Sequence, residues 1–141
     1  MSVNKLLVRQ RLAYIDGQRQ ELARMRTLPL PEFIEPRNAA AAETFLRRSL
    51  EAVFDIGRHI LAKTGHGELA QEYKSIARGL GALGAVSGSL AAKLVEMAGY
   101  RNRLVHLYWE VTADELYRIL QDELDSFVSF VKEVMAYLDT V

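Results

Sequence analysis

Two long apolar seams constrain the fold of this chain more than any other feature. Within 38–64 and again within 112–138, apolar or small side chains recur every three or four residues. That spacing places them on one face of a helix, whereas a half-buried strand would alternate polar and apolar residues. No segment alternates in that way, so the sequence predicts an all-α protein. The first seam comprises Ala42, Phe45, Ser49, Val53, Ile56 and Ile60, and the second comprises Tyr117, Leu120, Leu124, Phe127, Val131, Val134 and Leu138.

Proline and glycine divide the chain into helices. Pro29, Pro31 and Pro36 fall close together and predict the one clear linker, because proline blocks helix continuation. Before the linker we expect a helix over 3–27, and after it helices over 38–64, about 69–83, from 88, and over 112–138. On the first helix we place Leu7, Tyr14, Ile15, Leu22 and Met25 near one inward face. On the fourth we place Leu90, Leu94 and Met97 inward.

Cap signals mark where these helices begin and end. We expect N-caps at Asn38, Ser87 and Thr112, with Glu115 completing a capping box, and stops at Gly65 and Gly84. Short connections between long amphipathic helices predict an antiparallel up-and-down bundle of four main helices plus one short helix. We assign residues 1–141 to a single domain. The two long apolar seams either serve the core alone or also leave enough exposed apolar area to form the interface of a homodimer.

Composition narrows the classes of function. The 141 residues include 18 basic and 18 acidic side chains and no cysteine, which excludes a disulfide framework and a thiolate metal site. A net charge of zero argues against a protein that coats nucleic acid. Residues 1–60 nevertheless carry ten basic and seven acidic side chains, which leaves room for a local basic site. With no secretory signal or membrane-spanning stretch, we expect a soluble cytoplasmic protein without a membrane partner.

Three patterns of known chemistry are present only in part. Residues 79–84 match G-x-G-x-x-G, but no strand precedes them, so we interpret them as a turn between helices. A di-metal bundle needs Glu three residues before His, whereas Ile56 precedes His59 and Arg103 precedes His106. We therefore expect no metal and no cofactor. Asp55 and His59 share a helix face, and we expect a carboxylate–imidazole contact between them.

Polar side chains interrupt the inward face of the fourth helix at its end. Arg101 continues the row of Leu94 and Met97, and Asn102 continues the neighbouring row, although polar groups there are costly unless paired or functional. On one regular helix Asn102 and His106 face the same way, as do Arg101 and Tyr108, whereas Arg101 and His106 point about 140° apart.

That geometry leaves several alternatives open. The helix end is distorted, Arg101 reaches round the helix, or a symmetric partner completes a site. A further alternative is a buried Arg/His network that fixes a helix end or a dimer register.

The string from Arg101 to Tyr108, R-N-R-L-V-H-L-Y, resembles the R-x4-H-x-Y signature of the HEPN superfamily, and its form is similar to that of the HepT branch. The all-helical prediction, the length, the Ala/Glu-rich helix over 38–64 and the motif's place in the fourth helix agree with this resemblance. HepT proteins are the toxin halves of prokaryotic HepT/MntA (type VII) toxin–antitoxin pairs. The resemblance therefore implies a homodimeric helical bundle with facing motifs and a metal-independent endoribonuclease that takes RNA as substrate.

The resemblance also implies a role for each motif residue. Arg101 and His106 would be the catalytic pair, with Asn102 and Tyr108 in supporting roles. Tyr108 would accept AMP from an MntA-like minimal nucleotidyltransferase antitoxin, which silences the toxin. Arg103 is a candidate for a further phosphate contact or a solvated side chain.

Two other functions fit the same fold. One is a non-catalytic helical binding module that partners a nucleotidyltransferase, and the other is a purely structural helical dimer. The neighbouring 110–125 segment carries six acidic residues and one arginine, which suits either the dipole of the last helix or a basic partner surface.

Overall fold

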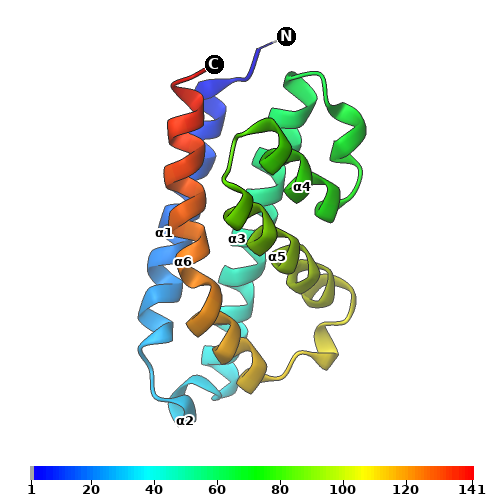
Figure 1. Ribbon diagram of the computed structural model, residues 1–141. Coiled ribbons are helices and arrows are strands. Elements are labelled where there is room, and N and C mark those ends of the chain that lie inside the picture. Colours follow the sequence, from blue (N-terminus) through cyan, green and yellow to red (C-terminus); the bar gives the residue numbers. More distant parts are fainter. Residues whose placement is uncertain (1) are drawn as a thin grey trace.

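The computed structural model describes residues 2–141, and these form a bundle of antiparallel helices (Figure 1). α1 (Lys5–Arg26) runs beside α3 (Pro36–Lys63) and α6 (Ala113–Leu138). α5 (Gly88–His106) packs on α3 and α6, and the shorter α4 (Tyr73–Leu83) covers α5 and α3. The predicted all-α bundle of four main helices and one short helix is confirmed.

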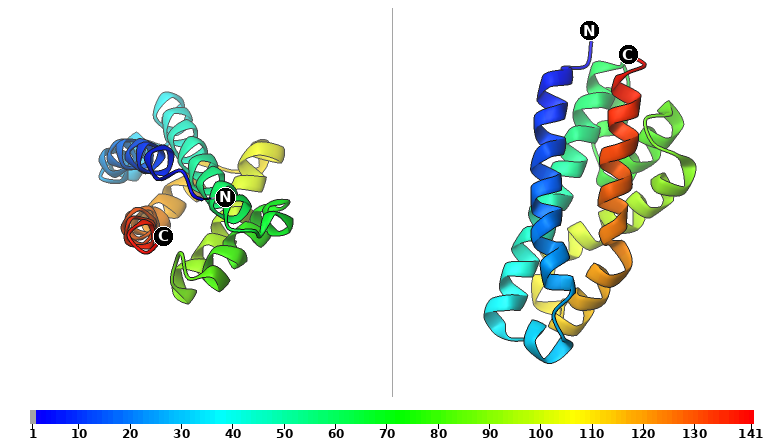
Figure 2. Two further views of the ribbon diagram at one scale, coloured as in Figure 1. Left: turned by 90° about the horizontal axis from the view of Figure 1, so that it is seen from above. Right: turned by 90° about the vertical axis from the view of Figure 1, so that its left-hand side faces the viewer.

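Three short elements connect the main helices. A single helical turn, α2 (Leu30–Phe33), lies inside the predicted proline linker, and two 3-10 turns, η1 (Gly67–Ala70) and η2 (Tyr108–Glu110), follow α3 and α5. Seen from above and from the side, both chain ends lie at one end of the bundle, opposite α2 (Figure 2). No helix within residues 2–141 combines the length and hydrophobicity needed to cross a membrane.

Most predicted helix ends are confirmed, and one N-cap is wrong. Ser87 and Thr112 each accept a hydrogen bond from the backbone N–H three residues later, and Gly84 ends α4 with a left-handed φ of 84°. Asn38 is not the N-cap of α3, which begins two residues earlier at Pro36. Proline suits the first helical turn because its missing N–H would have no helical partner there. The Asn38 side chain instead donates to the carbonyl oxygen of Glu32 at 2.9 Å.

The core lies where the seams predict it, with one exception on α1. The spacing predicts an inward Tyr14, but its side chain is 45% exposed. Residues Val8 and Leu12, which lie on the adjacent stripe, are buried in its place. The remaining core positions of the two long seams are buried or half-buried, including Ser49, whose hydroxyl donates to the carbonyl oxygen of Phe45 at 2.8 Å.

The glycines of the G-x-G-x-x-G string belong to a helix and its cap, so the predicted turn over 79–84 is mostly wrong. Gly79 and Gly81 lie within α4, and only Gly84 is at the turn. A Cβ on Gly81 would stand 2.7 Å from the Cβ of Ala91, so the glycine allows α4 and α5 to approach closely. The glycines of this string therefore serve close helix packing and not phosphate binding.

Candidate active site at the end of α5

Arg101 is held between α3 and α4 by a carboxylate and an aromatic ring. Its Nε donates to Oε1 of Glu51, and its guanidinium carbon lies 4.0 Å from the centre of the Tyr73 ring. The hydroxyl of Tyr73 in turn donates to Oε2 of Glu51 at 3.2 Å. The side chain of Arg101 is 14% exposed and that of Glu51 is 32% exposed. The polar residue that interrupts the inward face of α5 is therefore paired.

Asn102 completes the fixation of the guanidinium. Its Oδ1 accepts a hydrogen bond from Nη1 of Arg101 at 3.2 Å. A guanidinium has five N–H donors, of which Glu51 and Asn102 each take one. Three N–H groups are thus left without a protein partner within residues 2–141. Arginine presents these donors in a rigid plane that suits phosphate.

His106 is the last residue of α5, and its side chain is exposed. Residues 101–106 remain helical, so Arg101 and His106 point about 140° apart, as ideal helix geometry requires. No hydrogen bond joins the two side chains in the part of the chain that the structure describes. Within one subunit, no direct contact therefore brings the guanidinium of Arg101 and the imidazole of His106 to a common point.

α5 breaks directly after His106, so Tyr108 is not on the same regular helix as Arg101 and the two do not share a helix face. Leu107 leaves the helical conformation with φ of −134° and ψ of 36°, while its N–H still donates to the carbonyl oxygen of Arg103. Tyr108 and Trp109 follow in the turn η2, with 59% and 67% of their areas exposed. Their rings meet edge to face at 5.4 Å.

A groove of about 320 Å³ lies beside these two aromatic side chains. Its walls come from the first turns of α3 and α6, including Ala40, Glu43 and Thr112. The Tyr108 side chain is thus open to a reacting partner and stands at the edge of a recess. Neither core packing of Trp109 nor burial of Tyr108 is found in the described chain.

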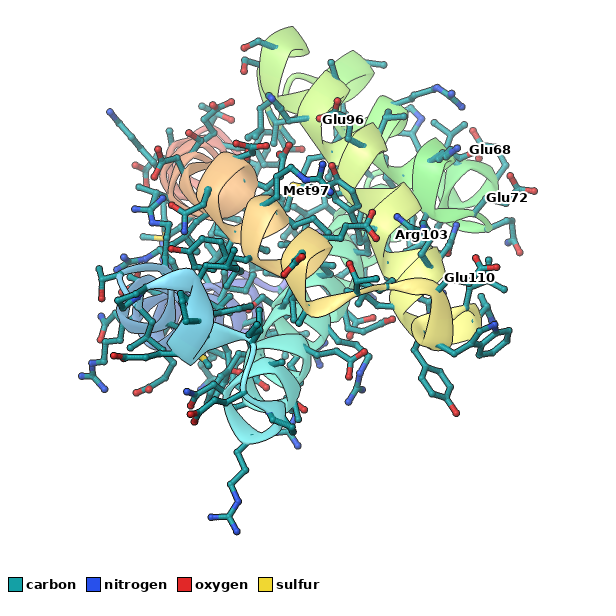
Figure 3. The ribbon with its side chains drawn as sticks, turned by 90° about the horizontal axis from the view of Figure 1, so that it is seen from below. Glu68, Glu72, Glu96, Met97, Arg103 and Glu110 are labelled. Atoms are coloured by element: carbon teal, nitrogen blue, oxygen red, sulfur yellow. The ribbon has the colours of Figure 1, made fainter. Side chains whose placement is uncertain are left out.

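Arg103 pairs with α6. Its Nη1 and Nη2 donate to the two carboxylate oxygens of Glu115, the second at 2.8 Å. This bidentate pair raises the pKa of Arg103 and lowers the pKa of Glu115. The capping box of α6 is consequently only half formed, because Thr112 caps the helix while Glu115 turns to Arg103. In the view from below, Arg103 projects from α5 and Glu110 lies past its end (Figure 3).

Two further expectations concern histidine and metal. Asp55 pairs with Arg58 at 2.8 Å and not with His59, whose Nε2 accepts the backbone N–H of Asn4 at 3.1 Å. The predicted carboxylate–imidazole contact is therefore wrong. Within residues 2–141, no group of three or more His, Asp or Glu side chains is placed to hold a metal ion.

Sequence reasoning missed Glu51 and Tyr73, the two partners of Arg101 outside its own helix. Glu51 lies 50 residues before Arg101, and neither side chain belongs to a local motif. One signal was available in the helix over 38–64. Glu51 follows Arg47 by four residues and precedes Asp55 by four, so a polar row runs beside the apolar seam.

Comparison with known proteins gives relatives over nearly the whole chain. The model of the family described as "Ribonuclease HepT-like" matches residues 17–134. A tRNA nuclease HepT from Aphanizomenon flos-aquae (strain 2012/KM1/D3) is 23% identical over 141 residues, which cover 99% of this chain and 95% of that protein.

Two solved structures share the fold. The cytosolic protein of unknown function YutE from Bacillus subtilis superposes with a TM-score of 0.83 at 20% identity, covering 99% of this chain and 94% of that one. The crystal structure of a toxin–antitoxin with AMP-PNP gives a TM-score of 0.81 at 22% identity, with 92% and 97% covered. The family match covers most of the chain and includes the whole R-x4-H-x-Y string. The chain therefore belongs to the HepT-like ribonuclease family, in agreement with the enzyme class that its motif predicts.

Proposed function

We propose that this protein is the toxin of a type VII (HEPN/MNT) toxin–antitoxin pair and acts as a metal-independent RNA endonuclease. In this proposal Arg101 and His106 are the catalytic residues, Asn102 positions Arg101, and two subunits place their motifs face to face. The observation that carries the proposal is the fixed guanidinium of Arg101, which keeps three N–H groups unpaired on the same helix end as an exposed His106. The relative named as a tRNA nuclease makes tRNA the first substrate to test.

The chemistry requires only groups that the motif contains. The 2′-oxygen of the RNA forms a bond to phosphorus while the bond from phosphorus to the 5′-oxygen breaks. One imidazole accepts the proton of the 2′-hydroxyl, and a second donates a proton to the leaving 5′-oxygen. The products are a 2′,3′-cyclic phosphate and a 5′-hydroxyl. Arg101 stabilises the negative charge that gathers on the phosphoryl oxygens.

A homodimer supplies the second imidazole that this scheme needs. Each subunit carries one motif histidine, and within a subunit His106 points away from Arg101. The exposed Leu107, Tyr108 and Trp109 at the end of α5 provide apolar surface for a contact between copies. We therefore assign the base and acid roles to the two copies of His106.

The test is cleavage of tRNA by the purified protein in EDTA. We expect cleavage with cyclic phosphate ends, and a loss of about a hundredfold or more in rate for both Arg101→Ala and His106→Ala. Arg78→Ala, an exposed arginine on α4, is the matched control and keeps full activity. Helical circular dichroism must be unchanged in all three variants. If wild type and His106→Ala cleave equally slowly, the protein is a binding module and not a nuclease.

Mixed dimers test the division of roles. Co-expression of differently tagged wild-type and His106→Ala chains gives heterodimers with one imidazole. We expect these to lose most activity, because either the base or the acid is missing. Half of the wild-type turnover, from one site that works alone, contradicts the shared mechanism.

Tyr108 is the proposed site of silencing by AMP transfer from an MntA-like nucleotidyltransferase. Its exposed position beside the groove of Ala40, Glu43 and Thr112 supports this role, because an acceptor hydroxyl must be reachable by another protein. An attached AMP adds bulk and negative charge close to the motif and competes with the substrate phosphate. The structure of a toxin–antitoxin with AMP-PNP, whose fold this chain shares, supports a nucleotide-dependent partner.

A further inference from the structure

A second recess, larger than the one beside Tyr108, lies between α1 and α3. Its volume is about 550 Å³, within the usual range of ligand sites. One wall consists of α1 residues at spacings of three and four, and the other of α3 residues at similar spacings, because each helix presents one face. The basic and aromatic members are Arg11, Tyr14, Arg47 and Arg48.

Three arginines of this groove have no acidic partner in the described chain. Arg11, Arg47 and Arg48 form no ion pair within 4.0 Å anywhere in residues 2–141. The two carboxylates of the groove are already engaged, Asp55 by Arg58 and Glu51 by Arg101. Three unneutralised guanidinium groups thus face one recess in a chain whose formal net charge is zero.

Arg11 of the groove also acts on His59 of α3. Burial lowers the pKa of His59 first, and the charges of Lys63 and Arg11 lower it further. An anion entering this region would gain from those charges. The exposed ring of Tyr14, which is 45% accessible, adds a surface on which a base can stack.

Glu51 connects this groove to the candidate active site. It lines the groove, and its two carboxylate oxygens hold Arg101 and Tyr73. A polyanion lying along Arg47 and Arg48 therefore reaches the residue that positions the catalytic guanidinium. The groove beside Tyr108, by contrast, has no arginine among the described residues of its lining.

We propose that the α1/α3 groove binds the backbone of single-stranded RNA outside the cleavage site, with Arg11, Arg47 and Arg48 on its phosphates and Tyr14 against a base. This inference rests on the proposed ribonuclease function, since it gives the substrate its path to Arg101. RNA is the expected occupant because guanidinium groups beside an aromatic ring match the alternating phosphates and bases of a single strand.

Binding is measured apart from cleavage to test this. The full chain carrying His106→Ala is titrated into a fluorescently labelled single-stranded RNA 12-mer, and anisotropy gives Kd at several salt concentrations. The triple variant Arg11→Gln/Arg47→Gln/Arg48→Gln in that background should weaken binding at least tenfold. The slope of log Kd against log salt concentration should fall by about 2, because each lost phosphate contact removes about 0.7. Tyr14→Ala should weaken it about fivefold or more with little change in slope.

The matched control removes three other exposed cations, with Arg9→Gln/Arg78→Gln/Lys132→Gln, and should leave Kd within about twofold. Equal effects of the two triple variants, or no effect of the groove variant, overturn the proposal. So does a groove variant that changes the oligomeric state in light scattering while RNA affinity stays the same, because the groove is then an interface between copies.

Failure of this inference is separable from failure of the proposed function. In the background with His106 intact, the groove variant should raise KM for RNA with kcat unchanged. If wild type cleaves RNA and the groove variant has the same KM, the RNA-binding role of the groove is rejected and the nuclease function is kept. Groove-dependent binding without any cleavage by wild type rejects the nuclease and keeps the groove.

Discussion

At the scale of single residues, the candidate site depends on how one guanidinium is held. Arg101 uses one N–H on Glu51 and one on Asn102 while stacking on Tyr73, so its position is fixed before substrate arrives. Fixed donors stabilise a transition state better than mobile ones because they need no reorganisation during the reaction. In the proposed mechanism, Glu51 is thus a positioning residue that acts through Arg101.

Graded substitution of Glu51 tests this role. In Glu51→Gln the amide oxygen still accepts from Arg101, so we expect a fall in kcat of only a few fold. Glu51→Ala removes the acceptor, and we expect kcat to fall about tenfold or more with a smaller change in KM. Steady-state kinetics on tRNA gives both constants. A merely structural role would instead lower the thermal midpoint and leave kcat per folded molecule unchanged in both variants.

Tyr108 allows cleavage and modification to be separated. Tyr108→Phe removes only the hydroxyl of an exposed side chain, so we expect an unchanged melting temperature. Incubation with the nucleotidyltransferase and ATP should add about 329 Da, the mass of one attached AMP group, per AMP unit to wild type and nothing to Tyr108→Phe. Intact mass spectrometry measures this. AMP found on the phenylalanine variant would place the acceptor elsewhere.

At the scale of elements, close helix packing depends on glycine. Gly81 faces Ala91, and a Cβ at that position would lie 2.7 Å from the Ala91 Cβ, so two rigid groups would clash. Gly81→Ala should therefore push α4 from α5 and cost about 1–3 kcal/mol. Gly99→Ala on α5 is the matched control, because no heavy atom lies within 4 Å of its added Cβ.

The control is expected to stabilise the protein by about 0.5–1 kcal/mol, since alanine loses less backbone entropy than glycine in a helix. Urea denaturation followed by circular dichroism measures both variants. Equal free energies of unfolding for the two would mean that α4 and α5 are not in close contact in solution.

Elements were also the level that the sequence predicted best. The three- and four-residue spacing of the seams is local, and it located α3 and α6 to within a few residues. The pairing of Arg103 with Glu115 was not predicted, because it depends on how α6 approaches α5. The sequence left a distorted end of α5 only as one of several alternatives. The motif named Arg101 and His106, whereas Glu51 and Tyr73 emerge only when α3 and α4 are brought against α5.

At the scale of the whole molecule, one buried carboxylate links stability to pH. Glu123 on α6 is buried, its Oε2 has no hydrogen-bond partner within residues 2–141, and Lys93 is 3.8 Å from its Oε1. Burial raises the pKa of Glu123 above its ordinary value, Lys93 opposes this, and Glu96 adds to it. Folding therefore favours the protonated acid.

The sign of the pH effect follows from that raised pKa. The stabilising contribution of protonated Glu123 is complete below the ordinary value of 4.5 and is lost as pH rises through the raised pKa of the folded state. Glu123→Gln cannot ionise, so it should be more stable than wild type by about 1 kcal/mol at pH 7 and nearly equal to it at pH 4. Urea unfolding at the two pH values measures this.

An exposed acid provides the reference for that experiment. Asp139→Asn changes the same formal charge at the exposed end of α6 and should alter stability by less than about 0.5 kcal/mol at either pH. A Glu123→Gln variant that loses stability at pH 7 would show that the Lys93 contact outweighs the cost of burying the carboxylate.

The two chain ends emerge together, at the pole of the bundle away from α2 (Figure 2). A fluorescent reporter, an affinity handle or a bead tether can consequently be attached to either end without standing over the turn η2, where Tyr108 and Trp109 lie. Surface-immobilised molecules should then keep the turn η2 open to solution, which makes single-molecule recording of RNA capture a practical format for this protein.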